Sequence, residues 1–173
     1  MIAGYIRGGR SRALRPVLQP ANLVVGEWRA RTEDQLAGLT VELIRSRAPL
    51  YSEPLASAAL EWVTALTAVV LPESQAYPRL YSALDGMIGA IEAAPAARGW
   101  AVALARYEDL LLAELGYGLG ETQAVTGESG WPEIIVALAQ TGREIETHLL
   151  TDRRAETLAA RARLVERLKR AVA

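Results

Sequence analysis

The stretch from residue 8 to residue 24 reads GGRSRALRPVLQPANLV, and strand-like segments lie on both sides of it. Four arginines lie in this stretch or directly before it: Arg7, Arg10, Arg12 and Arg15. The first acidic residue of the chain is Glu27, so no carboxylate close in sequence neutralises them. A planar guanidinium donates paired hydrogen bonds to phosphate oxygens, so arginines gathered on a glycine-containing loop suit a polyanionic ligand. The alternative is an ordinary solvated surface loop.

Strand patterns flank the arginine-rich stretch. Runs of β-branched, aromatic and alternating apolar residues predict strands at 2–7, 22–31 and 39–44, with Gly26 as a candidate bulge. The polar segment 32–35 predicts a turn that joins the last two strands as a hairpin. Three strands with one solvated face form a marginal sheet whose edges stay unpaired.

From about residue 52 onward, apolar residues recur at helical spacing. Five helices are expected, at 52–71, 78–94, 97–115, 132–149 and 155–172. Ser52 is the expected N-cap of the first helix, and Gly116 the left-handed residue that ends the third. In the last helix, Leu158, Ala162, Val165 and Leu168 are expected to face inward, opposite a basic face. The pattern predicts an α+β fold with a strand-rich domain at 1–50 and a helical domain at 51–173.

Composition excludes several classes of protein. The chain has 173 residues, of which 51% are hydrophobic and 23% charged, so it can bury a core and is not expected to be disordered. It contains no cysteine and one histidine, which excludes disulfides and thiolate or multi-histidine metal sites. No apolar run reaches the roughly 18–20 residues that span a bilayer, and no secretory signal pattern opens the chain. We therefore expect a cytoplasmic protein without a metal, a cofactor or a membrane segment.

Candidates for catalysis are weak. Glu61 and Glu108 lie on predicted helices, but neither has a second carboxylate at a recognisable spacing. Ser11 and Ser129 have no histidine near them, and His148 is expected to be an exposed or partly packed helix residue. The sequence therefore favours a binding protein over an enzyme.

Binding features are stronger, because positive charge is segregated although the net charge is −1. Tyr5 and Trp28 could stack on bases of a single strand next to the arginine-rich stretch. For Trp28 we favour the alternative that it lies in the core of the sheet, and Tyr5 stays undecided. A second basic surface is predicted on the last helix, for which the alternative is an ordinary solvated helix face. Its cations are Arg153, Arg154, Arg161, Arg163, Arg167, Lys169 and Arg170.

Three segments resemble the RecO family of bacterial recombination mediators, in the order in which that family carries them. The first is the G-x-R-S-[KR]…L-Q-P segment that begins at Gly8. The second is RYEDLLLAELGY at 106–117, which is similar to the family helix R-[FY]-E-x-x-L-L-x-x-L-G-[YF]. The third joins 138–149, with its Thr-Gly pair and His148, to ARARL at 160–164.

This resemblance implies a mediator without catalytic chemistry. Members of the family bind and anneal single- and double-stranded DNA, contact the C-terminal tail of single-strand-binding protein, and act with RecR to load RecA. It implies that Arg7, Arg10, Arg12 and Arg15 contact phosphates. It also implies that Arg106, with apolar residues such as Leu55 and Leu60, binds the acidic, hydrophobic tail. The alternative for Arg106 is a structural ion pair with Glu108 or another helix.

The chain departs from the family pattern in two ways. The family's oligonucleotide-binding (OB) barrel needs about five strands, whereas the sequence predicts three, so we expect an incomplete OB-like barrel. A truncated gene product, a start codon assigned too late and a divergent open sheet all remain alternatives. Many members carry zinc-binding cysteines after the L-G-[YF] helix, but Gln123 stands where the first would be, and we expect that a segment of the family pattern is missing there. A second hypothesis is therefore a truncated helical protein-binding module without DNA activity.

Overall fold

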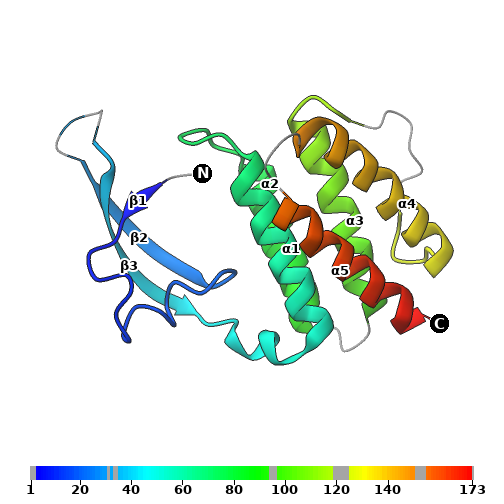
Figure 1. The fold of residues 1–173 in the computed structure, drawn as a ribbon, viewed down its shortest axis with the longest axis horizontal. Coiled ribbons are helices and arrows are strands. Elements are labelled where there is room, and N and C mark those ends of the chain that lie inside the picture. The colour runs from blue at the N-terminus through cyan, green and yellow to red at the C-terminus, as the bar shows by residue number, and fades with distance from the viewer. Residues whose placement is uncertain are drawn as a thin grey trace.

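The computed structural model describes residues 3–30, 32, 35–93, 97–118, 125–150 and 155–172. Its strands are β1 (Gly4–Tyr5), β2 (Leu23–Arg29) and β3 (Ala37–Arg45). A short 3₁₀ helix, η1 (Ala48–Ser52), leads into α1 (Pro54–Val70), α2 (Pro78–Ala93), α3 (Ala97–Glu114), α4 (Trp131–Glu144), the π-helical turn η2 (Ile145–Leu149) and α5 (Ala155–Val172). The fold is α+β, as the sequence predicts. Figure 1 shows the sheet beside the helices, with the segment after β3 joining the two parts.

The three strands form one open sheet in the order β1–β3–β2. β2 and β3 pair antiparallel, which confirms the predicted hairpin, although part of its turn lies outside the described residues. β1 pairs in parallel with only Ala37 and Gly38 of β3 and is shorter than the strand predicted at 2–7, whose Ile2 also lies outside the described residues. The irregularity in β2 falls between Leu23 and Val24 and not at Gly26. The described strands do not close a barrel.

One face of the sheet is apolar and points toward the helices. The cross-strand partners on this face are Trp28 with Leu39, Gly26 with Val41, and Val24 with Leu43. Directly paired residues share a face because side chains alternate along each strand. This alternation is the pattern from which the strands could be predicted.

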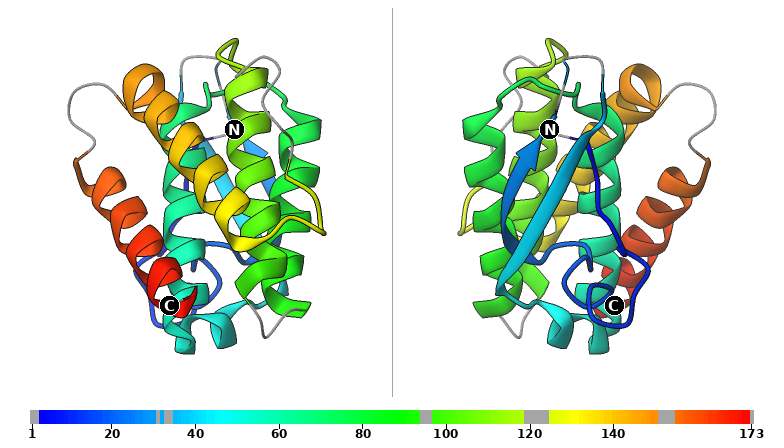
Figure 2. Two further views of the ribbon diagram at one scale, coloured as in Figure 1. Left: turned by 90° about the vertical axis from the view of Figure 1, so that its right-hand side faces the viewer. Right: turned by 90° about the vertical axis from the view of Figure 1, so that its left-hand side faces the viewer.

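The helices supply the core of the molecule. α1 and α2 lie nearest the sheet, and α3, α4 and α5 lie beyond them (Figures 1 and 2). α2 packs on α3, α3 on α4, and α1 on α5. The large side chains that are almost completely buried come from α1 to α4 and η2: Trp62, Tyr107, Leu60, Leu66, Leu80, Met87, Leu104, Leu111, Leu112, Ile134, Leu138 and Ile145. Burial of apolar surface on this scale is the main stabilising contribution to the fold.

Two helix ends show what sequence can predict about capping. α3 ends in a Schellman motif, as Gly116 predicts: this residue has φ +88°, the Tyr117 N–H donates to the Leu112 carbonyl at 2.8 Å, and the Gly116 N–H donates to the Ala113 carbonyl at 3.1 Å. The predicted N-cap at Ser52 is wrong. The cap position of α1 is Glu53, and the Ser52 hydroxyl donates to the Pro49 carbonyl instead. Pro54 fixes the helix start because proline suits the first helical position.

The last two predicted helices also differ in detail from the structure. The helix expected at 132–149 is α4 followed by the π-helical turn η2. On α5, Leu168 is buried and Leu158 and Val165 are half-buried, as predicted, but Ala162 is exposed. The inward side also includes Arg161, which the sequence assigned to the basic face and which reaches a buried carboxylate on α3. No helix in the described part of the chain is long and apolar enough to cross a membrane.

Candidate nucleic-acid interface

The predicted phosphate-binding arginines lie on the segment from Arg7 to Asn22, which joins β1 to β2 and is called the arginine loop below. It is built from consecutive tight turns. The Gly9 N–H donates to the Ile6 carbonyl at 3.1 Å, and the Ser11 N–H donates to the Gly8 carbonyl at 2.8 Å. Gly8 has φ +73°, a left-handed conformation that a side chain would disfavour. The two glycines therefore form a tight turn directly before Arg10.

Further bonds order the rest of the loop. The Arg15 N–H donates to the Ser11 carbonyl at 3.1 Å, and the Leu18 N–H donates to the Leu14 carbonyl at 2.9 Å. The Ser11 hydroxyl oxygen also accepts the Leu14 N–H at 3.3 Å. The loop therefore carries its arginines on hydrogen-bonded turns.

All four arginines of the loop are exposed: Arg7, Arg10, Arg12 and Arg15. Within the described part of the chain, none of them forms an ion pair or a side-chain hydrogen bond. Arg79, Arg161 and Arg163, in contrast, each face a glutamate. The positive charge of the loop is therefore not compensated by the described side chains, as a phosphate-binding surface requires.

The end of the loop is fastened to the rest of the fold by Asn22, Arg47 and Tyr51. The Asn22 amide donates to the carbonyls of Pro16 at 2.7 Å and Val17 at 3.1 Å, and its oxygen accepts the Arg47 N–H at 2.8 Å. The Arg47 guanidinium donates through Nη1 to the Ala21 carbonyl at 3.0 Å. These bonds connect the loop to the segment between β3 and α1.

Tyr51 adds a further connection. Its hydroxyl donates to the Pro20 carbonyl at 2.9 Å. Burial, and then the negative charge of Glu61, raise the pKa of the Tyr51 phenol. The hydroxyl therefore stays protonated and remains a donor at neutral pH.

Arg47 also joins this region to α2. It is only 4% exposed, its Nη2 lies 2.9 Å from Asp85 Oδ1, and its Nε lies 3.6 Å from Glu92 Oε1. The contact between Arg47 Nε and Glu92 is an ion pair but not a hydrogen bond. Arg45, at the end of β3, approaches Glu92 Oε2 at 3.1 Å. Two carboxylates of α2 thus balance the cations at the junction.

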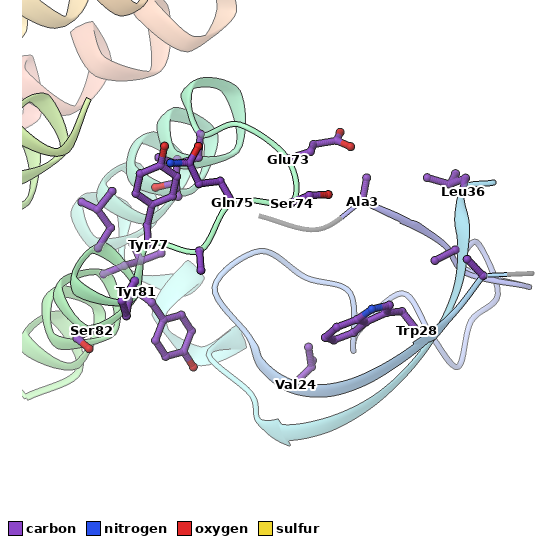
Figure 3. Close-up of a pocket in the computed structure, with 18 of the residues that line it drawn as sticks. Ala3, Val24, Trp28, Leu36, Glu73, Ser74, Gln75, Tyr77, Tyr81 and Ser82 are labelled. Atoms are coloured by element: carbon purple, nitrogen blue, oxygen red, sulfur yellow. The ribbon is translucent and has the colours of Figure 1, made fainter. Parts of the chain in front are cut away.

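A groove of about 1450 Å³ separates the apolar face of the sheet from the α1–α2 connection. Figure 3 shows Trp28 and Val24 on the sheet side, and Tyr77 and Tyr81 on the other side. Among the described lining residues, Glu73 is the only charged one. The groove is therefore mainly apolar, and none of its described lining residues is a cation that could pair with a phosphate.

The preferred placement of Trp28 in the sheet core is wrong, because its side chain is 56% exposed. Trp28 lies on the apolar face of the sheet, as the alternation of residues along β2 predicts, but no described helix or strand packs over its ring. Tyr5, which was undecided, is 62% exposed. Both rings are accessible to a ligand.

Acrylamide should therefore quench the fluorescence of Trp28 strongly. Trp62 and Trp100 are buried and Trp131 is half-buried, so Trp28 is the most accessible of the four tryptophans. We expect Trp28→Phe to lower the Stern–Volmer slope and shift the remaining emission to shorter wavelength. Equal slopes for the two proteins would mean that the ring is covered in solution.

The three residues assigned to a partner tail do not share one surface. Leu60 is 0% exposed and belongs to the helical core, so the prediction that it contacts a partner is wrong for this conformation. Leu55 is half-buried near the start of α1. Arg106 is exposed on α3, and its Nε donates to the Val125 carbonyl at 2.8 Å. The alternative of an Arg106–Glu108 ion pair is also wrong, since Glu108 pairs with Arg161.

Glu108 is the centre of a buried polar network that the sequence does not reveal. Its side chain is 1% exposed and accepts hydrogen bonds from Trp62 Nε1 at 2.7 Å, from Arg161 Nη2 at 3.0 Å and from the Thr141 hydroxyl. The Arg161 guanidinium also lies over the Trp62 ring, 5.6 Å from its centroid. The network ties α1, α3, α4 and α5 together. The only signal in the sequence was that Glu108 and Arg161 lie in two of the three family-like segments.

Most described cations of the second predicted basic surface, on α5, have a partner within the fold. Arg163 pairs with Glu61, Lys169 lies 3.1 Å from Glu166, and Arg167 donates to the Pro54 carbonyl. Arg153 and Arg154 lie outside the described residues. These contacts favour the alternative of an ordinary helix face.

The residues considered for catalysis have structural contacts. His148 stacks on Tyr117 with ring centroids 4.8 Å apart, and its Nε2 lies 3.2 Å from Glu144 Oε2. The Ser129 hydroxyl oxygen accepts the Thr126 N–H at 2.9 Å. Among the described residues, no group of three or more histidines and carboxylates could hold a metal ion. Gln123, discussed for the family's zinc site, lies outside the described residues.

Known proteins are similar to this chain along most of its length. A DNA repair protein RecO from Gluconacetobacter diazotrophicus is 39% identical over 149 positions, which cover 84% of this chain and 58% of that protein. One from Cereibacter sphaeroides is 37% identical over 143 positions, which cover 82% of this chain and 58% of that protein. The chain thus spans somewhat more than half the length of these two relatives. No solved structure gives a significant match.

A third relative matches nearly the whole chain. The DNA repair protein RecO of Rhodospirillum centenum is 33% identical over 212 positions, covering 98% of this chain and 83% of that protein. Because the alignment is longer than the 173 residues of the chain, that relative has internal residues opposite gaps here. The family model described as "Recombination protein O C terminal" matches residues 51–172. From these two matches we conclude that the chain belongs to the RecO family.

Proposed function

We propose that this protein acts in DNA repair and homologous recombination by binding DNA through the arginine loop. The observation that carries this proposal is the set of four exposed arginines without an ionic partner among the described residues, on a loop that is fastened to the fold. Lys and Arg bind nucleic acid mainly through phosphates, and each contact releases counterions. The names of the relatives support the role in repair.

The finer parts of the proposal follow from the family. Residues 1–50 form the nucleic-acid-binding domain and residues 51–173 the helical domain. The protein anneals complementary strands and helps to load RecA on DNA coated by single-strand-binding protein, together with RecR. The exposed Arg106 and the half-buried Leu55 are the candidates for the partner tail that remain after Leu60 is removed. The action is binding without catalysis.

DNA binding is tested directly by fluorescence anisotropy with a labelled oligo(dT). We expect measurable affinity at about 20 mM salt, where charges act over more than 20 Å. The affinity should fall steadily with salt, with a slope of about −3 in log K against log[salt] if four phosphates are contacted. A peptide nucleic acid of the same base sequence is the matched control, because it has bases without phosphates. No binding of oligo(dT) even at the lowest salt would refute the proposal.

The open sheet favours one second candidate. The three described strands do not close a barrel, and Trp28 stays exposed. The chain could then be a helical protein-binding module without DNA activity. The same titration separates the two candidates, since the second predicts no affinity for oligo(dT) at any salt concentration.

A further inference from the structure

We propose that Asn22 and Arg47 are positioning residues for DNA binding. They fix the end of the arginine loop, so that the loop is already ordered when its arginines contact phosphates. The inference rests on the proposed function and extends it to two residues that touch no phosphate themselves. Neither residue is part of the exposed cationic set. Both act through the backbone of the loop.

The contacts divide the arginine loop into two halves. Its first half, which carries the arginines, is held by local turns such as Ser11 to Gly8. In its second half, side chains outside the 16–21 segment bind the carbonyls of four residues: Pro16, Val17, Pro20 and Ala21. The second half is therefore the anchor from which the first half extends.

Asn22 is the central part of this anchor because one side chain uses both its donor and acceptor groups. Its amide nitrogen reaches two carbonyls, of Pro16 and Val17, at 2.7 and 3.1 Å. Its oxygen accepts the Arg47 N–H at 2.8 Å, across 25 residues of sequence. A side chain with only donors or only acceptors could not make this set of bonds.

Arg47 connects the anchor to the helical bundle. A guanidinium that is 4% exposed carries a large desolvation cost unless its partners are well placed. Here Asp85 and Glu92 of α2 balance the charge, and Nη1 is directed to the Ala21 carbonyl. The two terminal nitrogens of the planar fork donate to the Ala21 carbonyl and to Asp85 at the same time, with a fixed spacing that the single ammonium nitrogen of lysine does not reproduce.

Fixing the loop has a measurable signature. A loop that is ordered before binding loses less conformational entropy in the complex, so its affinity is higher. The number of phosphate contacts in the complex is unchanged if the loop is merely loosened. Loss of positioning should therefore lower affinity at every salt concentration, whereas loss of a contacting arginine should also lower the salt slope.

The experiment compares Asn22→Ala, Arg47→Lys and Ser46→Ala with the wild-type chain in the oligo(dT) titration. Ser46 is the matched control, because it lies at the same junction and, within the described structure, its hydroxyl oxygen accepts the Ala48 N–H and contacts no residue of the arginine loop. We expect Asn22→Ala and Arg47→Lys to weaken binding roughly three- to ten-fold, in keeping with the modest net contribution of the hydrogen bonds that are lost, three of them in Asn22→Ala. Their salt slopes should match that of the wild type, and Ser46→Ala should change neither quantity.

The outcomes are separable. If the wild type binds DNA and Asn22→Ala binds equally well, the positioning role is refuted and the proposed function stands. If Asn22→Ala lowers the slope as an arginine substitution does, Asn22 acts as a phosphate contact and the inference is also refuted. Failure of the wild type to bind refutes the proposed function. Thermal unfolding followed by circular dichroism shows whether Arg47→Lys is folded, and Asn22→Ala decides the question if it is not.

Discussion

Replacing Glu108 by alanine is expected to lower the free energy of unfolding by about 3–5 kcal/mol. The substitution removes the carboxylate that accepts hydrogen bonds from Trp62, Thr141 and Arg161. It leaves the largely buried Arg161 guanidinium without its ionic partner and opens a cavity between four helices. An unpaired buried charge costs more than the original pair contributed, so this should be among the most damaging single changes in the helical part.

Urea denaturation followed by circular dichroism measures this effect. The matched control is Glu61→Ala, which also removes a glutamate paired with an arginine of α5, but with both side chains about half exposed. We expect a change of less than about 1 kcal/mol for the control. Glu108→Gln should fall between the two, because it keeps an acceptor for Trp62 but loses the charge that faces Arg161. Equal stability of Glu108→Ala and Glu61→Ala would contradict the account of the network.

Local patterns in the sequence predict the elements of the fold well. The β2–β3 hairpin follows from alternation on both sides of a polar turn, and α2, α3 and α5 begin within a residue of their expected starts. Gly116 ends α3 because a left-handed residue is needed there. Each of these features depends on residues that are close in sequence.

Features that depend on distant residues could not be predicted. Trp28 alternates as a core residue should, but alternation identifies a face of the sheet and not whether another layer covers it. Glu108 meets Trp62 across 46 residues and Arg161 across 53, and no periodicity connects these positions. The inner face of α5 was predicted only in part, because Arg161, a charged residue, lies on it and Ala162 is exposed.

In the candidate site, too, the features that depend on neighbouring residues could be predicted and those that depend on distant residues could not. The arginine cluster is visible in the sequence, since all four cations lie within nine residues without an acid between them. Its anchor is not visible, because Asn22, Arg47 and Asp85 come from three separate segments. The resemblance to the RecO family underlies the proposed function, whereas the contacts of Asn22 and Arg47 could be found only in the structure.

Replacing Arg7, Arg10, Arg12 and Arg15 together by alanine should weaken binding of oligo(dT) more than a hundred-fold at 50 mM salt. Each phosphate contact with a single strand adds about 0.7 to the magnitude of the salt slope. Between 1 M and 50 mM salt, such a contact therefore raises the affinity by roughly eight-fold. The arginines are exposed and form no ion pair within the described structure, so their loss should not unfold the helices. The circular dichroism spectrum should stay close to that of the wild type.

The control for this variant must remove the same charge from another part of the surface. Four exposed arginines outside the loop serve this purpose: Arg29, Arg79, Arg163 and Arg170. Their joint replacement by alanine changes the net charge equally, so any general electrostatic attraction falls by a similar amount. A variant that keeps the arginine loop should nevertheless keep most of the affinity.

The central claim is that the arginine loop makes the phosphate contacts, and the salt slope of DNA binding tests it most directly. The slope of log K against log[salt] for oligo(dT) is measured for the wild type and both four-arginine variants. We predict that removing the loop arginines reduces the magnitude of the slope by about 3, whereas the control variant changes it by less than about 1. Equal slopes for the wild type and the loop variant would show that the phosphates are bound elsewhere and would contradict the account.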